Sequence, residues 1–251
     1  MNSHSRPRFA LAASAAIFLL AAGASAWIAR PPLLRAQAGE SQQRLADLKD
    51  SAAKNKAEIA HYTWTETVTI SLKGEQKKVQ HYQVIIGPDG KPVKTSTDPA
   101  PQAQDSGSAR GGRFKQRIVE KKKEEYEDYA EQMKNLAAQY LPPEKDLIQA
   151  AYAKGNVSFA PTPGIPAQIK IVIHSYYKPN DSVTILFDKT QKLIQSIAIA
   201  SYLSDPSDVM NLDVVFERIP AGPSHVATVR IDGVSKQLLL VTQNSNYVKQ
   251  Y

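Results

Sequence analysis

The sequence of 251 residues contains no cysteine. Without cysteine the chain can form no disulfide, no thiolate metal site and no cysteine nucleophile, and no lipid can be attached to an N-terminal cysteine. None of its histidines occur in pairs at the spacing of a metal site. It also lacks a G-x-S-x-G motif, a phosphate-binding loop and an S-x-x-K motif. We therefore expect a protein that is not an enzyme, with no catalytic residue, no metal and no cofactor.

A single long apolar run occurs near the N-terminus. Arg6 and Arg8 precede it, residues 9–22 are rich in Ala and Leu, and Ala24-Ser25-Ala26 is a small-residue cleavage site. This pattern predicts a signal peptide over residues 1–26, cleaved near Ala26, and a periplasmic or secreted protein. The alternative is an uncleaved anchor, because residues 9–28 are nearly long enough to span a bilayer.

The charge balance is modestly basic. Cleavage after residue 26 would remove two arginines from the formal net charge of +7 and leave +5. Such a charge suits contact with anionic lipid headgroups or an acidic envelope protein. The exported location argues against a nucleic-acid partner.

The last third of the chain alternates apolar and polar residues in six short stretches, with turn residues between them. The stretches are residues 168–177, 182–188, 193–203, 211–217, 225–231 and 235–243. Period-two alternation predicts an antiparallel sheet with one apolar and one polar face. We expect Asp232-Gly233 to form a two-residue turn between the last two strands, because both turn positions tolerate positive φ.

The preceding residues add a hairpin and helices to this sheet. The stretch TWTETVTISL predicts a strand with Trp64, Val68 and Ile70 on one face, and a turn at Gly74-Glu75 leads into a returning strand. Residues 93–96 are a short third strand. Apolar residues at helical spacing predict helices over residues 34–59, 114–141 and 144–153.

These elements predict an N-terminal helical segment (27–60) followed by one α+β domain over residues 61–251. The parts of the domain are a β-hairpin (61–96), a flexible loop (97–112), two helices that form a lid (113–154) and the antiparallel meander (155–251). An apolar sheet face of this size needs a cover, which could be a second sheet, a helix or a ligand.

The order of a signal peptide, a hairpin, helices and a terminal meander resembles the LolA/LolB-like periplasmic lipoprotein-carrier superfamily. The stretches that carry the resemblance are YTWTETVTISLKGEQKK, ILFDKTQKLIQSIAIASYL and NLDVVFERIPAGPSHVATVRIDG. The resemblance implies a strongly curved antiparallel sheet, an incomplete barrel, whose concave apolar face is covered by helices. It also implies binding of acyl chains, or of a lipidated or partner protein, without covalent chemistry.

Our functional hypothesis is an envelope protein that binds an apolar ligand between sheet and lid. The expected lining consists of apolar strand residues: Trp64, Val68, Ile70, Ile171, Ile173, Ile185, Phe187, Ile197, Ile199, Val214 and Phe216. The expected lid residues are Tyr129, Met133, Leu136 and Tyr140. Basic residues at the start of the long helix could contact lipid headgroups or a partner: Arg110, Arg113, Lys115 and Arg117. The alternative is a structural or signalling module without a ligand cavity.

Overall fold

The computed structural model describes residue 50, residues 53–99 and residues 113–250. All of them belong to the unit Gly39–Tyr251. The expected signal peptide and most of the expected flexible loop lie outside the described residues. Within the described part of the chain, no helix is both long enough and apolar enough to cross a membrane.

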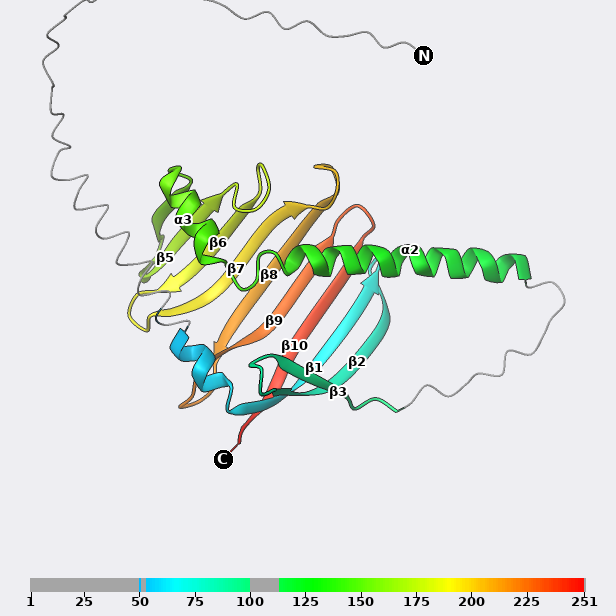
Figure 1. The fold of residues 1–251 in the computed structure, drawn as a ribbon, viewed down its shortest axis with the longest axis horizontal. Coiled ribbons are helices and arrows are strands. Elements are labelled where there is room, and N and C mark those ends of the chain that lie inside the picture. Colours follow the sequence, from blue (N-terminus) through cyan, green and yellow to red (C-terminus); the bar gives the residue numbers. More distant parts are fainter. Residues whose placement is uncertain (1–49, 51–52, 100–112, 251) are drawn as a thin grey trace, which may run out of the picture. The chain divides into compact units, whose positions relative to one another are not determined.

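Ten strands form one open antiparallel sheet (Figure 1). Their order is β3-β2-β1-β10-β9-β8-β7-β6-β5-β4, so β3 and β4 are the edges. The strands are β1 (Tyr62–Leu72), β2 (Glu75–Ile86), β3 (Pro92–Ser96), β4 (Val157–Thr162), β5 (Ile165–His174), β6 (Ser182–Asp188), β7 (Leu193–Tyr202), β8 (Val209–Arg218), β9 (Ser224–Gly233) and β10 (Leu238–Lys249). The last strand pairs with the first, which joins the N-terminal hairpin to the meander.

In the described residues between β3 and β4 there are two helices. They are α2 (Arg113–Ala137) and α3 (Lys145–Ala153), close to the predicted ranges. Residues 53–59 are also helical, within the helix predicted over 34–59. The six predicted strands of the meander and the short third strand are all present.

The turn between β1 and β2 lies one residue earlier than predicted. Leu72 pairs with Glu75, so the turn residues are Lys73 and Gly74, with φ of 53° and 81°. Positive φ at both positions is the geometry that tight hairpins require. The prediction of a turn at Gly74-Glu75 was therefore wrong by one residue.

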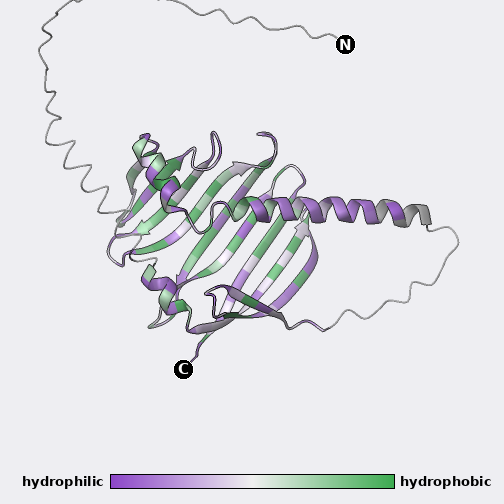
Figure 2. Ribbon diagram, in the orientation of Figure 1, coloured by the Kyte–Doolittle hydropathy of each residue, from purple (hydrophilic) through white to green (hydrophobic). Residues whose placement is uncertain are grey.

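Strand pairing places at least one apolar residue of each of eight strands on the same face, which we call the inner face. One row of directly paired residues runs across it: Ile70, Leu240, Ile231, Leu212, Ile199, Val183, Ile173 and Val157. Directly paired residues in antiparallel strands point to the same side of the sheet, so the whole row shares that face. Figure 2 shows the resulting green bands across the strands.

Burial of the inner face is uneven. In the neighbouring row, Val214 and Ile197 are 2% exposed and Ile185 is 1% exposed. Val68 and Val229, in the same row on β1 and β9, are only half-buried. The inner face is thus closed over β5 to β8 and partly open over β1, β10 and β9.

Gly233 does not form the predicted Asp232-Gly233 turn. It is the last residue of β9 and pairs with Leu238, so residues 234–237 form the turn. A Cβ at Gly233 would lie 2.5 Å from Cε1 of Tyr129 and 2.7 Å from Sδ of Met133. Glycine is needed here because α2 packs directly on the backbone of β9, which is a constraint of tertiary packing.

We predict that Gly233→Ala destabilises the fold by about 1–3 kcal/mol, because an added methyl group would force α2 away from the sheet. Urea unfolding measures this loss. The cost should be smaller in a Tyr129→Ala background, since Tyr129 supplies two of the three nearest atoms. If the losses of unfolding free energy from Gly233→Ala and Tyr129→Ala are strictly additive in the double variant, contact with Tyr129 is not the reason for the glycine.

Candidate ligand-binding face

The eleven predicted lining residues all lie on the inner face. Seven belong to one buried cluster: Ile171, Ile173, Ile185, Phe187, Ile197, Ile199 and Val214. Ile70 and Phe216 pack against this cluster. Val68 is half-buried on β1, and Trp64 is buried against Tyr247 instead. Whether these residues line a ligand site stays a prediction.

The four predicted lid residues are buried in the same cluster. Met133 and Tyr140 are fully buried, and Tyr129 and Leu136 are nearly so. Only the C-terminal half of α2 covers the sheet, since residues 120–125 are all exposed. In Figure 1 the N-terminal half of α2 continues past β1 and β2. Only about half of the length of α2 therefore covers the sheet.

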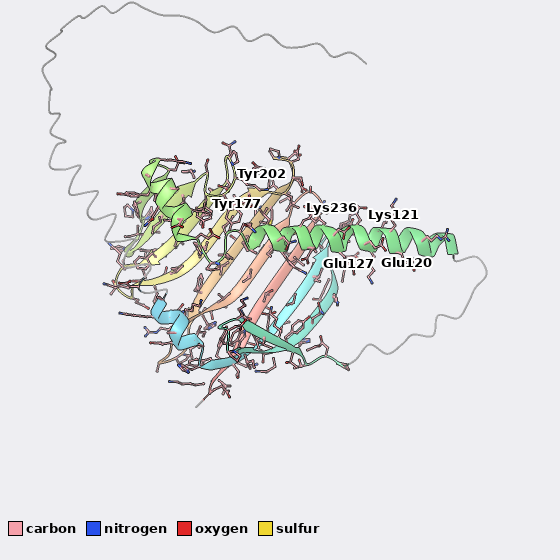
Figure 3. The ribbon with its side chains drawn as sticks, viewed as in Figure 1. Glu120, Lys121, Glu127, Tyr177, Tyr202 and Lys236 are labelled. Atoms are coloured by element: carbon pink, nitrogen blue, oxygen red, sulfur yellow. The ribbon has the colours of Figure 1, made fainter. Side chains whose placement is uncertain are left out.

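Tyr129 anchors the middle of α2 to the ends of the strands. Its hydroxyl donates to Oδ1 of Asp208 at 2.8 Å and shares a 3.0 Å hydrogen bond with Ser235. Lys236 pairs with Glu125 and lies over the Tyr129 ring, 5.1 Å from its centroid. Figure 3 shows Lys236 beside α2. Burial raises the pKa of Tyr129, because the phenolate would lose its hydration.

Tyr140 anchors the chain just after α2. Its hydroxyl donates to Oδ2 of Asp181 at 2.5 Å and shares a 2.8 Å hydrogen bond with Ser201. Burial, together with the Asp181 carboxylate, raises the pKa of Tyr140 well above its usual value. This residue therefore joins the lid to β7 and to the loop between β5 and β6.

Asp181 is the most deeply buried carboxylate of the described residues, at 2% exposure. It accepts hydrogen bonds from the backbone N–H groups of Tyr176, Tyr177 and Lys178 at 2.5, 3.0 and 2.6 Å. In the sequence this residue looks like an ordinary turn aspartate within KPND. Its link to Tyr140 could not be recognised, because the two residues are far apart in the chain.

A second polar cluster lies on the inner face at the opposite edge. Glu66 is 5% exposed on β1, and its carboxylate pairs with Lys94 of β3. The lysine side chain reaches past β2 to make this contact. Glu66 was missed from the sequence, although an acid at an apolar position of TWTETVTISL was a visible signal.

Aromatic rings border this cluster. Trp64 stacks on Tyr247 with centroids 5.4 Å apart, and Tyr247 lies 4.1 Å from the ring of His225. The indole N–H of Trp64 donates to Asn244 at 3.2 Å. Burial and the Glu66 carboxylate raise the pKa of Tyr247. The rings close off the end of β1 and β10.

The predicted basic contact residues are only partly described. Arg110 lies outside the described residues, as do the side chains of Arg113 and Lys115. Arg117 is exposed in the first half of α2. Contact of these residues with headgroups or a partner stays a prediction.

A polar pocket of about 340 Å³ lies away from the lid, between helical residues 53–59 and the turns before β7 and β9. Lys54, Lys192 and Arg218 line it together with Asp50 and Glu58. Its charges are mixed and largely offset one another. In the described part of the chain, no three His, Asp or Glu side chains come together as they would around a metal ion.

No protein-family model and no curated protein matches the sequence. The structure is similar to a DUF1329 family protein from Desulfovibrio piger, with 13% identity and a TM-score of 0.39 over 81% of this chain and 92% of that one. It is also similar to a LolA superfamily protein from Nitrosomonas europaea, with 8% identity and a TM-score of 0.39 over 82% and 93% of the two chains. A third is an outer membrane lipoprotein-sorting protein domain from Vibrio parahaemolyticus, with 9% identity and a TM-score of 0.40 over 80% and 91%.

The superfamily that the sequence resembles is thus represented among these structures. Sheets that superpose this loosely need not share a ligand. The function of this chain must therefore follow from its own residues.

The raised pKa values of Tyr129 and Tyr140 predict a loss of stability in alkali. An unfolded tyrosine ionises near pH 10, whereas these folded ones resist ionisation, so stability should fall as pH rises above about 10. Tyr140→Phe should make this fall shallower, by up to about 1.4 kcal/mol per pH unit, because one of the resisting groups is gone. Urea unfolding between pH 8 and 12 measures the slopes.

Tyr152→Phe in α3 serves as the control for loss of a tyrosine hydroxyl. In the described part of the chain, Asp181 and Ser201 are hydrogen-bonded to Tyr140 and not to Tyr152. Identical slopes for wild type and Tyr140→Phe would show that Tyr140 does not contribute to the alkaline loss.

Proposed function

We propose that the chain is an exported, non-catalytic binding protein that holds an apolar ligand, such as an acyl chain or the acylated end of a protein, on its inner face. The observation that supports this most is the breadth of the apolar surface relative to its cover. One apolar row crosses eight strands and a second is interrupted only by Thr242 on β10, whereas the anchors of α2 fall at one end of those strands.

Binding of such a ligand needs no catalytic or charged group, because burial of hydrocarbon supplies the free energy. Burial of hydrocarbon contributes about 0.8 kcal/mol per CH₂, so a chain laid along an apolar face binds through its length. The half-buried residues Val68 and Val229 mark the side where such a chain would enter. The closed part over β5 to β8 would then supply a rigid back wall.

The hydrogen bonds of Tyr129 and Tyr140 would hold α2 against the sheet when no ligand is bound. Each net hydrogen bond stabilises by about 1 kcal/mol, so a ligand that buries a few methylene groups could displace part of the lid. The exposed residues of α2, Arg117 and residues 120–125, would provide the surface by which a membrane or a partner protein moves the helix.

A second candidate is a protein-interaction module in which the lid never opens. The close approach of Tyr129 and Met133 to Gly233 favours it, because a helix packed this tightly leaves no space for a ligand beneath that part. The exposed residues of α2, Arg117 and residues 120–125, would then be the docking surface for an envelope protein.

A matched pair of valines tests the ligand-binding proposal. Val229 is on the inner face of β9, and Val241 is on the opposite face of β10, where it pairs with Thr69 and Arg230. Both are half-buried. Val229→Asn should weaken binding of an environment-sensitive fluorescent fatty-acid probe about tenfold, because it places an unpaired amide against hydrocarbon. Val241→Asn should leave the affinity unchanged.

Equal effects of the two variants, or no binding of the probe by folded wild-type protein, would contradict the proposal. Native mass spectrometry of protein purified from an envelope fraction separates the two candidates. Co-purified lipid supports the binding protein, and a stoichiometric protein partner without lipid supports the interaction module.

A further inference from the structure

The inner face changes from apolar to basic at β2 and β3. On β2, Lys78 pairs with Ile70, Gln80 with Val68 and Tyr82 with Glu66. Lys94 of β3 pairs with Val84, which in turn pairs with Trp64. These pairings place Lys78, Gln80, Tyr82 and Lys94 on the inner face, and we call them the basic rim. Figure 2 shows β2 as largely purple beside the green bands.

The basic rim borders the open part of the apolar surface. Val68, Ile70 and Val229 are half-buried there, and Lys78 is exposed next to Ile70. From β2 to β9 is three strand spacings, on the order of 14 Å. That span suits an extended hydrocarbon chain with a polar group at one end.

Lys94 is oriented by the carboxylate behind it. The Glu66 side chain is 7% exposed, whereas that of Lys94 is 46% exposed. The lysine side chain is therefore half-exposed, while the carboxylate that pairs with its ammonium group is covered. Of the other acids near β2, Glu75 pairs with Lys77 and Asp98 with His81. Within the described part of the chain, Lys78 forms no salt bridge, although its positive charge helps the hydrogen bonds from His81 to lower the pKa of Asp98.

We infer that the ligand is an anionic amphiphile. Its hydrocarbon chain lies on Val68, Ile70 and Val229, and its carboxylate or phosphate group binds Lys78 and Lys94. This inference rests on the proposed function and specifies the chemical class of the ligand's head group. Charge-assisted hydrogen bonds from lysine to an anion are stronger than neutral ones, so the basic rim selects the anionic head. A cationic head would meet the two lysines before it reached Glu66.

Four ligands with one hydrocarbon chain test the head group: tetradecanoate, tetradecyl phosphate, tetradecanol and tetradecylamine. Each is titrated below its micelle concentration against the probe bound to the full chain. Wild-type protein should bind at least one of the two anions about tenfold more tightly than the alcohol, and the amine more weakly than the alcohol. The ratio between the two anions distinguishes a fatty-acid head from a phosphate head.

Lys78→Gln should reduce the preference for the anion over the alcohol severalfold and leave the affinity for the alcohol unchanged. Lys170→Gln is the matched control, because Lys170 is exposed on the opposite face of β5 and its loss changes the net charge equally. If both variants reduce anion binding alike, the effect is one of net charge and the basic rim is not the site.

Glu66→Gln gives a test of opposite sign. Removal of the carboxylate frees Lys94 for the ligand, so binding of the anions should strengthen severalfold. Glutamine keeps an acceptor for Lys94 and the volume of the side chain, and circular dichroism confirms that the variant is folded. Weaker anion binding by this variant, or tighter binding of the amine by wild type, would overturn the inference.

The two proposals fail in different ways. If folded protein binds none of the four ligands, the proposed function itself is wrong. If the alcohol and the anions bind equally and Lys78→Gln has no effect, the apolar binding stands and only the selection of an anionic head is wrong.

Discussion

The pleat of the sheet is the constraint on which the rest of the structure depends. Successive residues of a strand point to opposite faces, so a shift of one residue in any pairing would move a whole apolar set into water. The pairing keeps Ile70 in one row with Leu212 and Ile173 although bulges interrupt several neighbouring pairs. The core, the seat of α2 and the open surface over β1 and β9 are all consequences of that shared register.

The lid combines one tight contact with several polar ones. At Gly233 the helix touches the backbone of the sheet, and its position there is fixed by van der Waals contact. The hydroxyl groups of Tyr129, at this contact, and of Tyr140, just after α2, add polar attachments, and each bonds to a carboxylate. Beyond Glu125 toward its N-terminus, α2 leaves the sheet and its described side chains are exposed. The described contacts between α2 and the sheet are therefore concentrated in the C-terminal half of the helix.

The two buried carboxylates of the inner face differ in how completely they are bonded. Asp181 accepts hydrogen bonds from three backbone N–H groups and from Tyr140, so it fastens a loop to the lid. Glu66 pairs with one half-exposed lysine. An apolar residue at such a position is often as stable as a buried ion pair or more so, so stability alone gives little reason for Glu66.

The sequence by itself determined the strands, the helices and the face on which each apolar residue lies, because period-two and period-3.6 alternation are local properties of the chain. It also determined that no cysteine chemistry is available. Tertiary structure alone decided three things: that β10 lies between β1 and β9, that Gly233 serves helix packing instead of a turn, and that Glu66 meets Lys94 across β2. Each is a contact between segments distant in sequence, and local alternation carries no information about which distant segment will fill the space.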